Sequence, residues 1–496
     1  MPRLDSYHYS PGAQPSLALP TDHSGDDAVD APTDAYVAMM MKWELINDLL
    51  GGTLAMRSAG KRWLPPEPRE QPRAYESRLQ RSYLYGALSD TVQKLSAKPF
   101  SKPVALTGEL PESLQMLVTN SDAKGADLTQ FARSLFMDGL KWGVTHVLVD
   151  YPSTGGGLNY SEERANNIRP YFSHISPLDL FAWQTATGLD GGDVLTQIRF
   201  KERRVKYDDV GYGERMCDFI RVIGLDYWEL WEREDDEKHY RKVDDGLHTV
   251  GHIPLVSFST TPTGFMTANP PLEDLAWMNL AHWQSFSDQR NILRFARVGI
   301  LFASGLSEEE VEGGFSIGPS NMISSTNPDA KLNYVEHSGA AIGAGEKDLR
   351  SLEERMEVLG LQPLMQSTGN VTATARAMDE ARQHSNIQAW IRGLENTIEN
   401  AFAHAGQWIG AELSEDFAVD VFNDFGVTLS ASEDVKSLTE MVRSGLISHA
   451  TYLQEVKRRG IIADELDVQN EIEEVEAQIG DSLTAAPEQE SDADSE

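Results

Sequence analysis

Cysteine is almost absent from this sequence of 496 residues, which contains only Cys217. A single cysteine cannot form a disulfide within the chain, and it excludes zinc sites built from several cysteines. Apolar runs are also short, because none approaches the roughly 18 residues that span a bilayer. The opening residues, MPRLDSYHYSPGAQPS, lack the apolar core of a secretion signal. We therefore expect a soluble intracellular protein without membrane contact, metal or cofactor.

Positive charge is scarce as well. The chain has 43 Lys and Arg against 77 Asp and Glu, a net charge of −34. This balance argues against a protein that grips nucleic acid through a broad basic face. It does not exclude a protein through which DNA merely passes, because an acidic wall keeps a polyanion from sticking. With 40% hydrophobic residues, the chain can still bury a sizeable core.

One catalytic pattern occurs, but its surroundings do not fit it. The segment GFSIG at 314–318 matches the G-x-S-x-G turn that exposes a serine nucleophile between a strand and a helix. Acidic residues precede it in place of a buried strand, and Pro319 follows where the helix should start. Asp329 and His337 come in the hydrolase order, but too close to Ser316 for the usual intervening elements. A Gly-rich turn explains the same residues, and a serine hydrolase using Ser316 stays as an alternative.

Other candidate sites are weaker. The glycine run 155–157 lacks the Gly-Lys-Ser/Thr of a phosphate-binding loop, so a solvated loop is the simpler interpretation. His248 and His252 would share one side of a helix or a strand, which permits metal binding, but the alternation around them favours a strand without metal. Large aromatic residues here indicate core or interface packing: Trp228, Trp231, Tyr83 and Tyr85.

Residues 35–268 are interpreted as an α+β body that follows a flexible, polar segment 1–34. Helical patterns begin with AYVAMMMKWELINDLLGG and AYESRLQRSYLYGALSDTVQKLS, which a cluster of prolines separates. A third helix is expected over Leu128 to Gly139, followed by a buried strand over Thr145 to Asp150. The later segments TQIRFKERR, FIRVIGLDYWELWERE, HYRKVDDGLHTV and HIPLVSFS alternate apolar and polar residues, which predicts strands.

The most informative feature is the order of parts between Pro270 and Gly410. A first helix opens on Pro270-Pro271, where proline at the first helical position costs nothing. An excursion rich in glycine and serine runs from Leu301 to Val335, and helix resumes over Glu346 to Leu359. The sequence Gly-Leu-Gln-Pro then breaks this helix, because proline removes a donor and clashes with the preceding turn. The order describes a projecting hairpin-like limb and not a pocket.

A loop at 366–370 separates that break from one long amphipathic helix of roughly 36 residues, on the order of 54 Å. Its apolar side follows helical spacing through Ile387, Ile391, Leu394, Ile398, Phe402, Ala405 and Ile409. The plain alternative is a core helix of an ordinary helical domain. Beyond it we expect short helices over Ser432 to Ser444 and Ser448 to Arg459. The end of the chain is acidic and compositionally disordered.

This ordered set resembles the portal proteins of tailed double-stranded DNA bacteriophages. The segment EKDLRSLEERMEVLGLQPLMQSTGNVTATARAMDEARQHSNIQAWIRGLENTIENAFA looks like the second half of their limb. Further matching stretches are YLYGALSDTVQKLSAKPFSKPV, KWGVTHVLVDYP, RPYFSHISPLDLFAW and HIPLVSF. The resemblance implies an α+β, mainly helical fold with a wing, a two-helix stem, a clip, a tunnel loop and a helical crown.

The resemblance also implies boundaries and site residues. It assigns 269–297 and 342–362 to the stem helices, 298–341 to the clip, 363–372 to the tunnel loop, 373–430 to a long wing helix with a following strand segment, 431–480 to the crown and 481–496 to a disordered tail. The implied tunnel-loop residues are Gln366, Ser367, Thr368, Gly369 and Asn370. The implied clip residues are Glu308, Glu309, Glu310, Gly314, Phe315, Ser316 and Asn321. Packing between subunits is expected at Trp283, Phe286, Ile391, Leu394, Ile398 and Phe402.

The function implied by the resemblance is structural and not enzymatic. Portal subunits form a ring, expected to have twelve copies, at one capsid vertex of the virion, after assembly in the host cytoplasm. Expected partners are the terminase large subunit, head-tail adaptor proteins, major capsid and scaffolding proteins, and double-stranded DNA passing through the channel without sequence preference. Another virion structural protein, such as a capsid or tail component, would show the same acidity and remains the main alternative.

Overall fold

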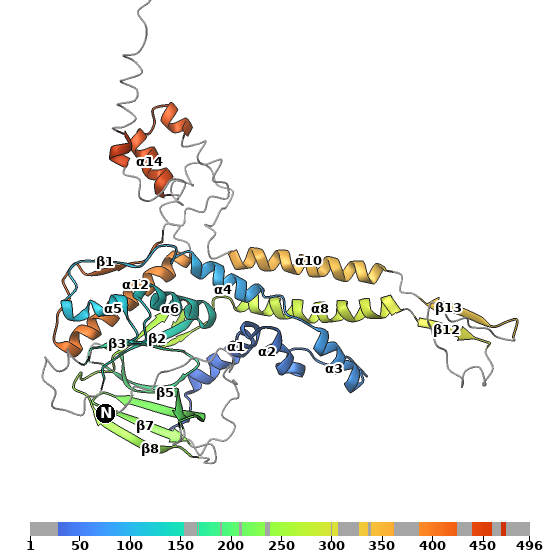
Figure 1. Cartoon of the computed structure of the whole chain (residues 1–496), viewed down its shortest axis with the longest axis horizontal. Helices are drawn as coiled ribbons and strands as arrows, with labels where there is room; N and C mark the ends of the chain where they lie inside the picture. The colour runs from blue at the N-terminus through green and yellow to red at the C-terminus, as the bar shows by residue number, and fades with distance from the viewer. Residues whose placement is uncertain are drawn as a thin grey trace, which may run out of the picture. The chain divides into compact units, whose positions relative to one another are not determined.

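A computed structural model of the chain combines helices and sheets in two compact units, Met1–Val421 and Phe422–Glu496 (Figure 1). The structure describes residues 28–152, 166, 168–188, 191–207, 211–233, 239–298, 300–305, 327–335, 339–361, 386–423, 439–458 and 468–472.

The helices at the start of the described part cover the two predicted helical segments, but residues 82–86 interrupt the second segment, and the helix at 52–59 was not predicted. These are α1 (Asp34–Leu50), α2 (Gly52–Ala59), the 3-10 turn η1 (Gly60–Arg62), α3 (Pro72–Arg81) and α4 (Ala87–Ala97). Thr33 caps α1, since its Oγ1 accepts a hydrogen bond from the backbone of Tyr36 at 3.4 Å. Trp43 of α1 is fully buried and donates from Nε1 to the carbonyl of Trp142 at 2.8 Å. This contact fixes α1 against the end of α6 (Leu128–Trp142).

Helix α6 leads directly into a buried three-stranded sheet. The helix runs three residues beyond the expected end at Gly139, because the residue that stops it is Gly143, with a left-handed φ of 86°. Strand β2 (Val144–Asp150) follows and is buried along its whole length, as predicted. Strands β3 (Tyr171–Ile175) and β9 (Leu255–Ser259) flank it on either side, and both pairings are antiparallel.

The second sheet is a five-stranded antiparallel meander in chain order. Its strands are β4 (Leu180–Thr187), β5 (Asp193–Tyr207), β6 (Glu214–Gly224), β7 (Tyr227–Arg233) and β8 (Arg241–Leu247). The segment FIRVIGLDYWELWERE falls on two of these strands, because the chain turns at Leu225-Asp226. The expectation of a strand across His248 and His252 is wrong, since both follow β8 and precede β9. The apolar cluster on this sheet includes Ile198 and Phe200.

Short elements complete this part of the unit. They are β1 (Ala105–Thr107), η2 (Glu112–Leu114), α5 (Met116–Thr119), β10 (Pro262–Gly264), β11 (Thr267–Ala268) and β14 (Ala418–Asp420). Strand β1 pairs antiparallel with β14, and β10 pairs with β11. The β1–β14 pair joins the segment that follows the last long helix of the unit to residues 105–107.

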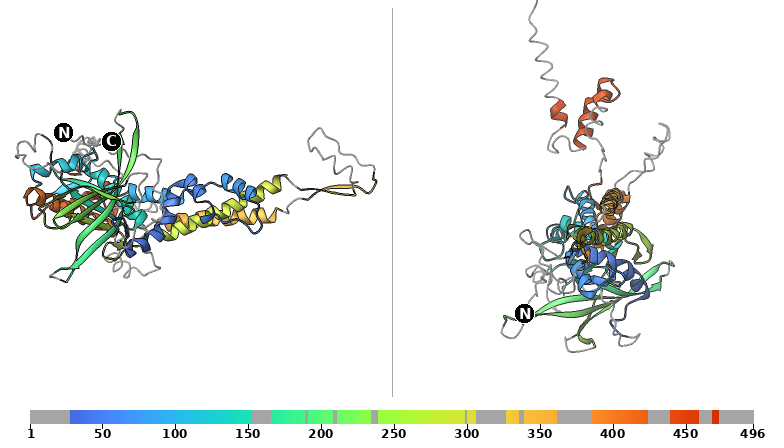
Figure 2. Two further views of the ribbon diagram at one scale, coloured as in Figure 1. Left: turned by 90° about the horizontal axis from the view of Figure 1, so that it is seen from below. Right: turned by 90° about the vertical axis from the view of Figure 1, so that its right-hand side faces the viewer.

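The limb consists of α8 (Glu273–Val298), β12 (Ile300–Ser304), β13 (Lys331–Val335) and α10 (Ala340–Leu361). Helix α8 begins after the two prolines, and α10 begins six residues earlier than the expected Glu346. The helices lie side by side and extend away from the two sheets, as Figures 1 and 2 show from different sides.

The last long helix of the unit is α12 (Asn386–Ile409), which packs on β9, β2 and α6. Its described length is 24 residues; the remainder of the expected 36-residue rod lies outside the described residues. The apolar side predicted from helical spacing faces the core, where Leu394 and Phe402 are fully buried.

The second unit contains α14 (His449–Arg458). Ser448 caps it as predicted, because its Oγ accepts from the backbone N–H of Thr451 at 3.1 Å. Of the expected helix over 432–444, the structure describes a helical stretch at 439–443. None of the helices described in either unit is both long and apolar enough to cross a bilayer.

Candidate functional site

The limb is the candidate functional site, and its two helices are antiparallel. Three polar contacts join the two helices at regular intervals. From one contact to the next the residue number falls along α8 and rises along α10, as it does in antiparallel helices. The pairs are Gln289 Nε2 with the carbonyl of Ile342 at 2.9 Å, Ser285 Oγ with Asp348 Oδ2 at 2.9 Å, and His282 Nε2 with Glu353 Oε1 at 3.2 Å. Met356 of α10 is buried, at 1% exposed.

Two glycines let α10 approach its neighbours closely. A Cβ on Gly345 would collide with the side-chain amide of Gln289, and a Cβ on Gly360 would lie 2.6 Å from Thr91 Oγ1 of α4. Glycine costs about 1 kcal/mol inside a helix relative to alanine. Glycine at these two positions therefore lowers the helix propensity of α10 but allows the helix to pack closely against Gln289 and Thr91.

The base of α8 is held by the first helices of the unit. Lys42 of α1 reaches Glu273 at 3.2 Å and the side-chain oxygen of Asn269 at 2.9 Å. The buried Asn279 donates to the carbonyl of Tyr85 at 2.8 Å and accepts from the backbone of Leu88 at 3.2 Å. Because both groups of the Asn279 amide are used, the register of α8 against α4 is fixed.

A buried arginine joins α3 to the middle of α8. Arg78 pairs with Glu70 at 2.8 Å and lies 3.7 Å from Asp288. It also donates to the carbonyl of Pro65 at 3.0 Å. The hydrogen bond from Arg78 lowers the pKa of Glu70, so this carboxylate stays ionised.

The far end of the described limb is a two-stranded ribbon, β12–β13. Its five residue pairs run from Ile300 opposite Val335 to Ser304 opposite Lys331. The side-chain amide of Asn327 donates to the carbonyl of Gly305 at 2.7 Å and closes the described part of the turn. The expected clip begins with this ribbon. Its named residues lie outside the described residues: Glu308, Glu309, Glu310, Gly314, Phe315, Ser316 and Asn321.

The predicted tunnel loop also lies outside the described residues, which end at Leu361 and resume at Asn386. Its named positions are Gln366, Ser367, Thr368, Gly369 and Asn370. The structure places this gap between the end of α10 and the start of α12, both elements of the first unit.

The expectation of packing between subunits needs correction. A single copy already buries Trp283, Ile391, Leu394, Ile398 and Phe402, each at most 1% exposed. A side chain without exposed surface offers none to a neighbour, so these five form the core of the chain itself. Phe286 is half-buried, and its ring packs on Tyr83 with centroids 4.3 Å apart.

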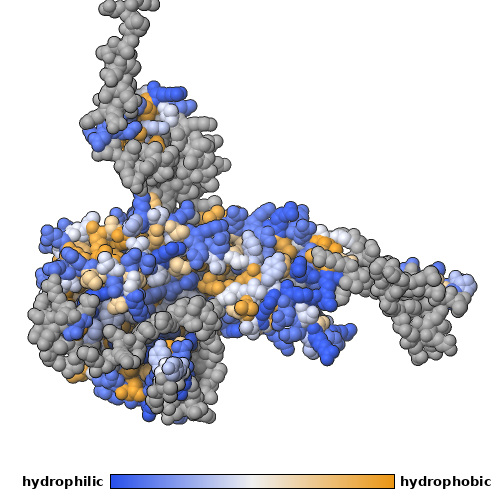
Figure 3. Space-filling model, in the orientation of Figure 1, coloured by the Kyte–Doolittle hydropathy of each residue, from blue (hydrophilic) through white to orange (hydrophobic). Residues whose placement is uncertain are grey.

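Exposed apolar side chains lie elsewhere on the limb. Trp277 of α8 is 53% exposed, and Val358 and Leu361 of α10 are 61% and 37% exposed. In Figure 3 the visible edge over α10 is mainly hydrophilic, with apolar patches between the polar residues. None of these positions was identified from the sequence, because helical spacing places them outside the continuous apolar stripe.

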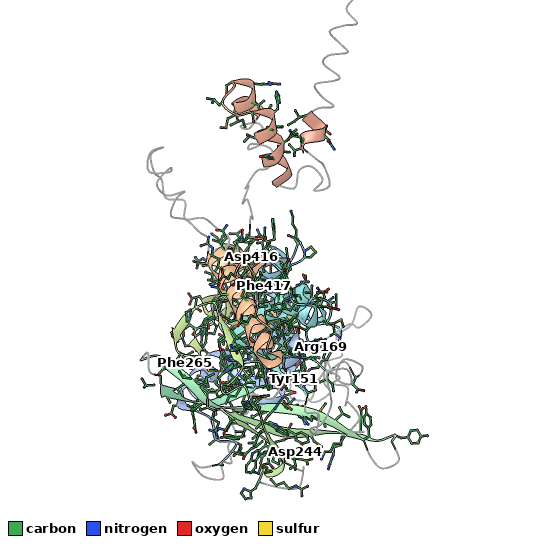
Figure 4. The ribbon with its side chains drawn as sticks, turned by 90° about the vertical axis from the view of Figure 1, so that its left-hand side faces the viewer. Tyr151, Arg169, Asp244, Phe265, Asp416 and Phe417 are labelled. Atoms are coloured by element: carbon green, nitrogen blue, oxygen red, sulfur yellow. The ribbon has the colours of Figure 1, made fainter. Side chains whose placement is uncertain are left out.

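A groove of about 1680 Å³ lies in the body between the two sheets and the end of α12. Tyr151 and Trp408 stack in its wall with ring centroids 5.5 Å apart. Figure 4 labels Tyr151 together with Arg169 and Asp244, which also line the groove. Arg221 binds both oxygens of Asp150, at 2.6 and 3.0 Å. Burial raises the pKa of Asp150, but the charge of Arg221 and its hydrogen bonds outweigh this, and the net shift is downward. The pair joins β2 to β6.

The residues weighed for chemistry do not converge. His252 Nε2 lies 2.9 Å from Nδ1 of His404, whose pKa is lowered by burial. Within the described ranges, no group of three or more His, Cys, Asp or Glu could hold a metal ion. Asp329 sits in an exposed turn, whereas Ser316 and His337 of the hydrolase alternative lie outside the described residues.

Comparison with known proteins gives a partial family match and distant structural similarity. A family model described as a domain of unknown function, DUF4055, matches residues 271–409, which is well under half of the chain and coincides with the limb and α12. Comparison with curated proteins gives no match.

Three solved structures are similar at low identity. The virion of a native gene transfer agent particle is 14% identical over 81% of this chain and 97% of that chain, with a TM-score of 0.38. The neck of an empty gene transfer agent particle, computed with C6 symmetry, is 12% identical over 75% and 89%, with a TM-score of 0.39. The neck of the native particle with C12 symmetry is 12% identical over 80% and 97%, with a TM-score of 0.39.

Proposed function

We propose that this chain is the subunit of a portal ring in a tailed double-stranded DNA phage or a related particle. The observation that carries the proposal is the limb. Two antiparallel helices leave an α+β body, end in a ribbon, return, and are followed by residues 362–385 and a buried helix. This is the order of stem, clip, stem, tunnel loop and wing helix that the sequence resemblance implies.

The charge of the chain suits this role. A net charge of −34 makes a wall that repels a polyanion, so DNA can slide through a channel without adhering to it. The expected tunnel loop, at 366–370, contains no charged residue. Contact between that loop and DNA is then weak, independent of sequence and only slightly dependent on salt.

The proposed partners follow the limb. Residues 298–341 would bind the terminase large subunit during packaging and head-tail adaptor proteins afterwards. The body and limb would contact major capsid and scaffolding proteins at one vertex. In this proposal the chain is structural and not an enzyme.

The proposal is tested by the size and shape of the purified full-length chain. We expect a closed ring of about twelve copies with a central channel, seen by negative-stain imaging and by mass measurement well above the 55.0 kDa monomer. A monodisperse monomer at micromolar concentration across salt conditions would overturn it. Closed shells or tubes without a central channel would favour the alternative of a different virion structural protein.

A further inference from the structure

One flank of the limb carries a group of arginines, Arg81, Arg290 and Arg294, here called the arginine flank. Arg290 and Arg294 are exposed and one turn apart on α8. The guanidinium of Arg290 lies 6.0 Å from the centre of the Phe286 ring, which packs on Tyr83. Since Tyr83 follows Arg81 by two residues, the end of α3 and the outer half of α8 meet at this point.

The arginine flank lacks a neutralising partner in the described part of a single chain. Arg81 donates from Nε to the carbonyl of Ser77 at 2.7 Å, and none of the three forms an ion pair with a described carboxylate. Burial and then the charges of Arg294 and Arg290 lower the pKa of Arg81. Three like charges are therefore held together without compensation.

The opposite flank of the same region carries an excess of negative charge. Glu67, Glu70 and Asp288, here called the acidic flank, surround the cation Arg78. Glu67 and Asp288 are exposed. Burial, followed by the charge of Glu67, raises the pKa of Asp288, as expected for a carboxylate among other carboxylates.

At Asp288 and Arg290 the two flanks lie at nearly the same height on opposite sides of α8, and Arg294 lies about 9 Å further along the helix than Asp288. Asp288 and Arg290 are two residues apart, which separates them by about 160° around the helix and about 3 Å along it. Copies that stand side by side around a common axis present one flank to the neighbour on each side. The arginine flank of one copy then faces the acidic flank of the next at matching height.

We infer that the arginine flank of one copy binds the acidic flank of the next, so that the limbs are joined by repeated charge pairing around the ring. This inference rests on the proposed ring function. A contact between two different faces of identical subunits closes into a ring when the rotation allows it. The aromatic pair Tyr83 and Phe286 supplies apolar surface beside the arginines.

Two simpler explanations account for less. Cations near a helix end interact favourably with its dipole, but this effect falls off within the last turn, and Arg290 lies two turns before Val298. A nucleic acid would neutralise the arginine flank and would leave the acidic flank uncompensated. A second copy of this chain compensates both.

The inference is tested with two charge-reversed full-length variants, Arg290→Glu with Arg294→Glu, and Glu67→Lys with Asp288→Lys. Each variant alone places like charges in every contact, and we expect the fraction of protein in rings at about 0.15 M salt to fall at least tenfold. An equimolar mixture should form rings again, in which the two variants alternate and every contact pairs opposite charges. The four changes combined in one chain should also restore rings.

Controls separate charge pairing from loss of fold. Lys98→Glu with Arg133→Glu reverses two exposed cations outside the limb, and rings should persist. The single variant Glu67→Lys spares Asp288 beside the buried Arg78, and it should weaken rings without lowering the melting temperature.

The outcomes distinguish failure of the charge-pairing inference from failure of the proposed ring function. A wild-type chain that forms no rings refutes the proposed function. Wild-type rings together with normal rings from both reversed variants refute only the charge pairing. The charge pairing would also be refuted if neither the mixture nor the combined variant formed rings. Normal rings from Arg290→Glu with Arg294→Glu, together with loss of salt-dependent binding to a labelled DNA duplex, would assign the arginines to nucleic acid instead.

Discussion

Gly143 shows how a single residue sets the junction between α6 and β2. Its φ of 86° ends the helix, and a Cβ at this position would collide with the backbone carbonyl of Asn269. Both conditions require glycine, because other residues rarely adopt this conformation and backbone cannot move aside easily. The buried strand β2 starts at the next residue, so a change of backbone conformation at Gly143 would displace the central strand of the three-stranded sheet.

We expect Gly143→Ala to destabilise the first unit by about 2–5 kcal/mol, the sum of the left-handed conformation and the overpacking. Denaturant unfolding of the purified variant measures this change. Gly52→Ala is the matched control, because Gly52 also has a positive φ, of 72°, but nothing lies within 4 Å of the added carbon. If both variants lost the same free energy of unfolding, the contact between the added carbon and Asn269 would contribute nothing to the destabilisation.

Asp179 is a second residue whose surroundings can be measured. Burial raises its pKa from 3.8 to about 6, although Arg203 and Lys201 act in the opposite direction. Its folded pKa lies above its unfolded pKa, so the folded state binds the proton more tightly. The resulting stabilisation is complete below pH 3.8 and is lost as the pH rises through about 6.

Asp179→Asn removes this titration. We expect the variant to gain stability over the wild type above pH 6 and to show little gain near pH 4, because the neutral amide resembles the protonated acid. Melting temperatures of both proteins between pH 4 and pH 8 test this expectation. A constant difference across that range would mean that Asp179 titrates normally.

At the scale of residues, capping is easier to predict than distant pairing. The cap at Ser448 follows from a serine placed before a helical pattern, and the structure confirms it. Glu395 and Glu399 look like ordinary polar residues on the outer side of α12. They instead accept hydrogen bonds from the backbone of Val421 and Val419 at 2.9 Å each. Neither partner lies within the helix, so no local pattern could reveal them.

At the scale of elements, the sequence predicts which side of a helix is apolar but not what covers it. The stripe along α12 suits contact between subunits and burial within one chain equally well. The structure resolves this choice in favour of the core, because the helix packs on β9 and β2. The order of helix, excursion and helix in the limb was predictable, since prolines and glycines mark each boundary.

The ribbon β12–β13 was not predicted. Each strand has only five residues, ILFAS and KLNYV, and twenty-six residues separate them (330 − 305 + 1 = 26). Pairing across such a separation depends on closing a long loop, which sequence alternation does not encode. The alternation within KLNYV was the one available signal.

The predicted tunnel loop gives an element-scale test of the portal proposal. Replacing Ser367 and Thr368 with tryptophan adds bulk to a short polar segment, which would narrow the channel without touching the limb. We expect ring assembly to persist while the length or retention of packaged DNA falls. Normal packaging and retention in particles that carry both substitutions would refute the placement of this loop.

At the scale of the whole molecule, the boundary between the two units lies at Val421. The first unit includes β14, which pairs with β1, and the backbone groups that bind Glu395 and Glu399. The second unit begins beyond these contacts, which therefore lie wholly within the first unit.

We expect a chain truncated after Asn423 to keep the melting temperature of the first unit to within about 2 °C. Truncation after Gly410 is the contrasting variant, because it removes β14 and leaves β1 without its partner strand. It should melt at a clearly lower temperature. A large loss from the longer truncated chain would show that the first unit depends on residues after Asn423.

The unbroken length of α8 has a mechanical consequence. The helix starts at Glu273, which Lys42 holds to the body, and its 26 residues form a rod about 39 Å long. Asn279 and Asp288 hold it to the region of α4 and to Arg78 of α3 as well, so α8 moves together with these helices, and a rotation of about 5° about its base moves its tip by about 3 Å. A slight rotation of the body is therefore amplified at Val298, and under the portal proposal a protein bound at the ribbon would be displaced by it.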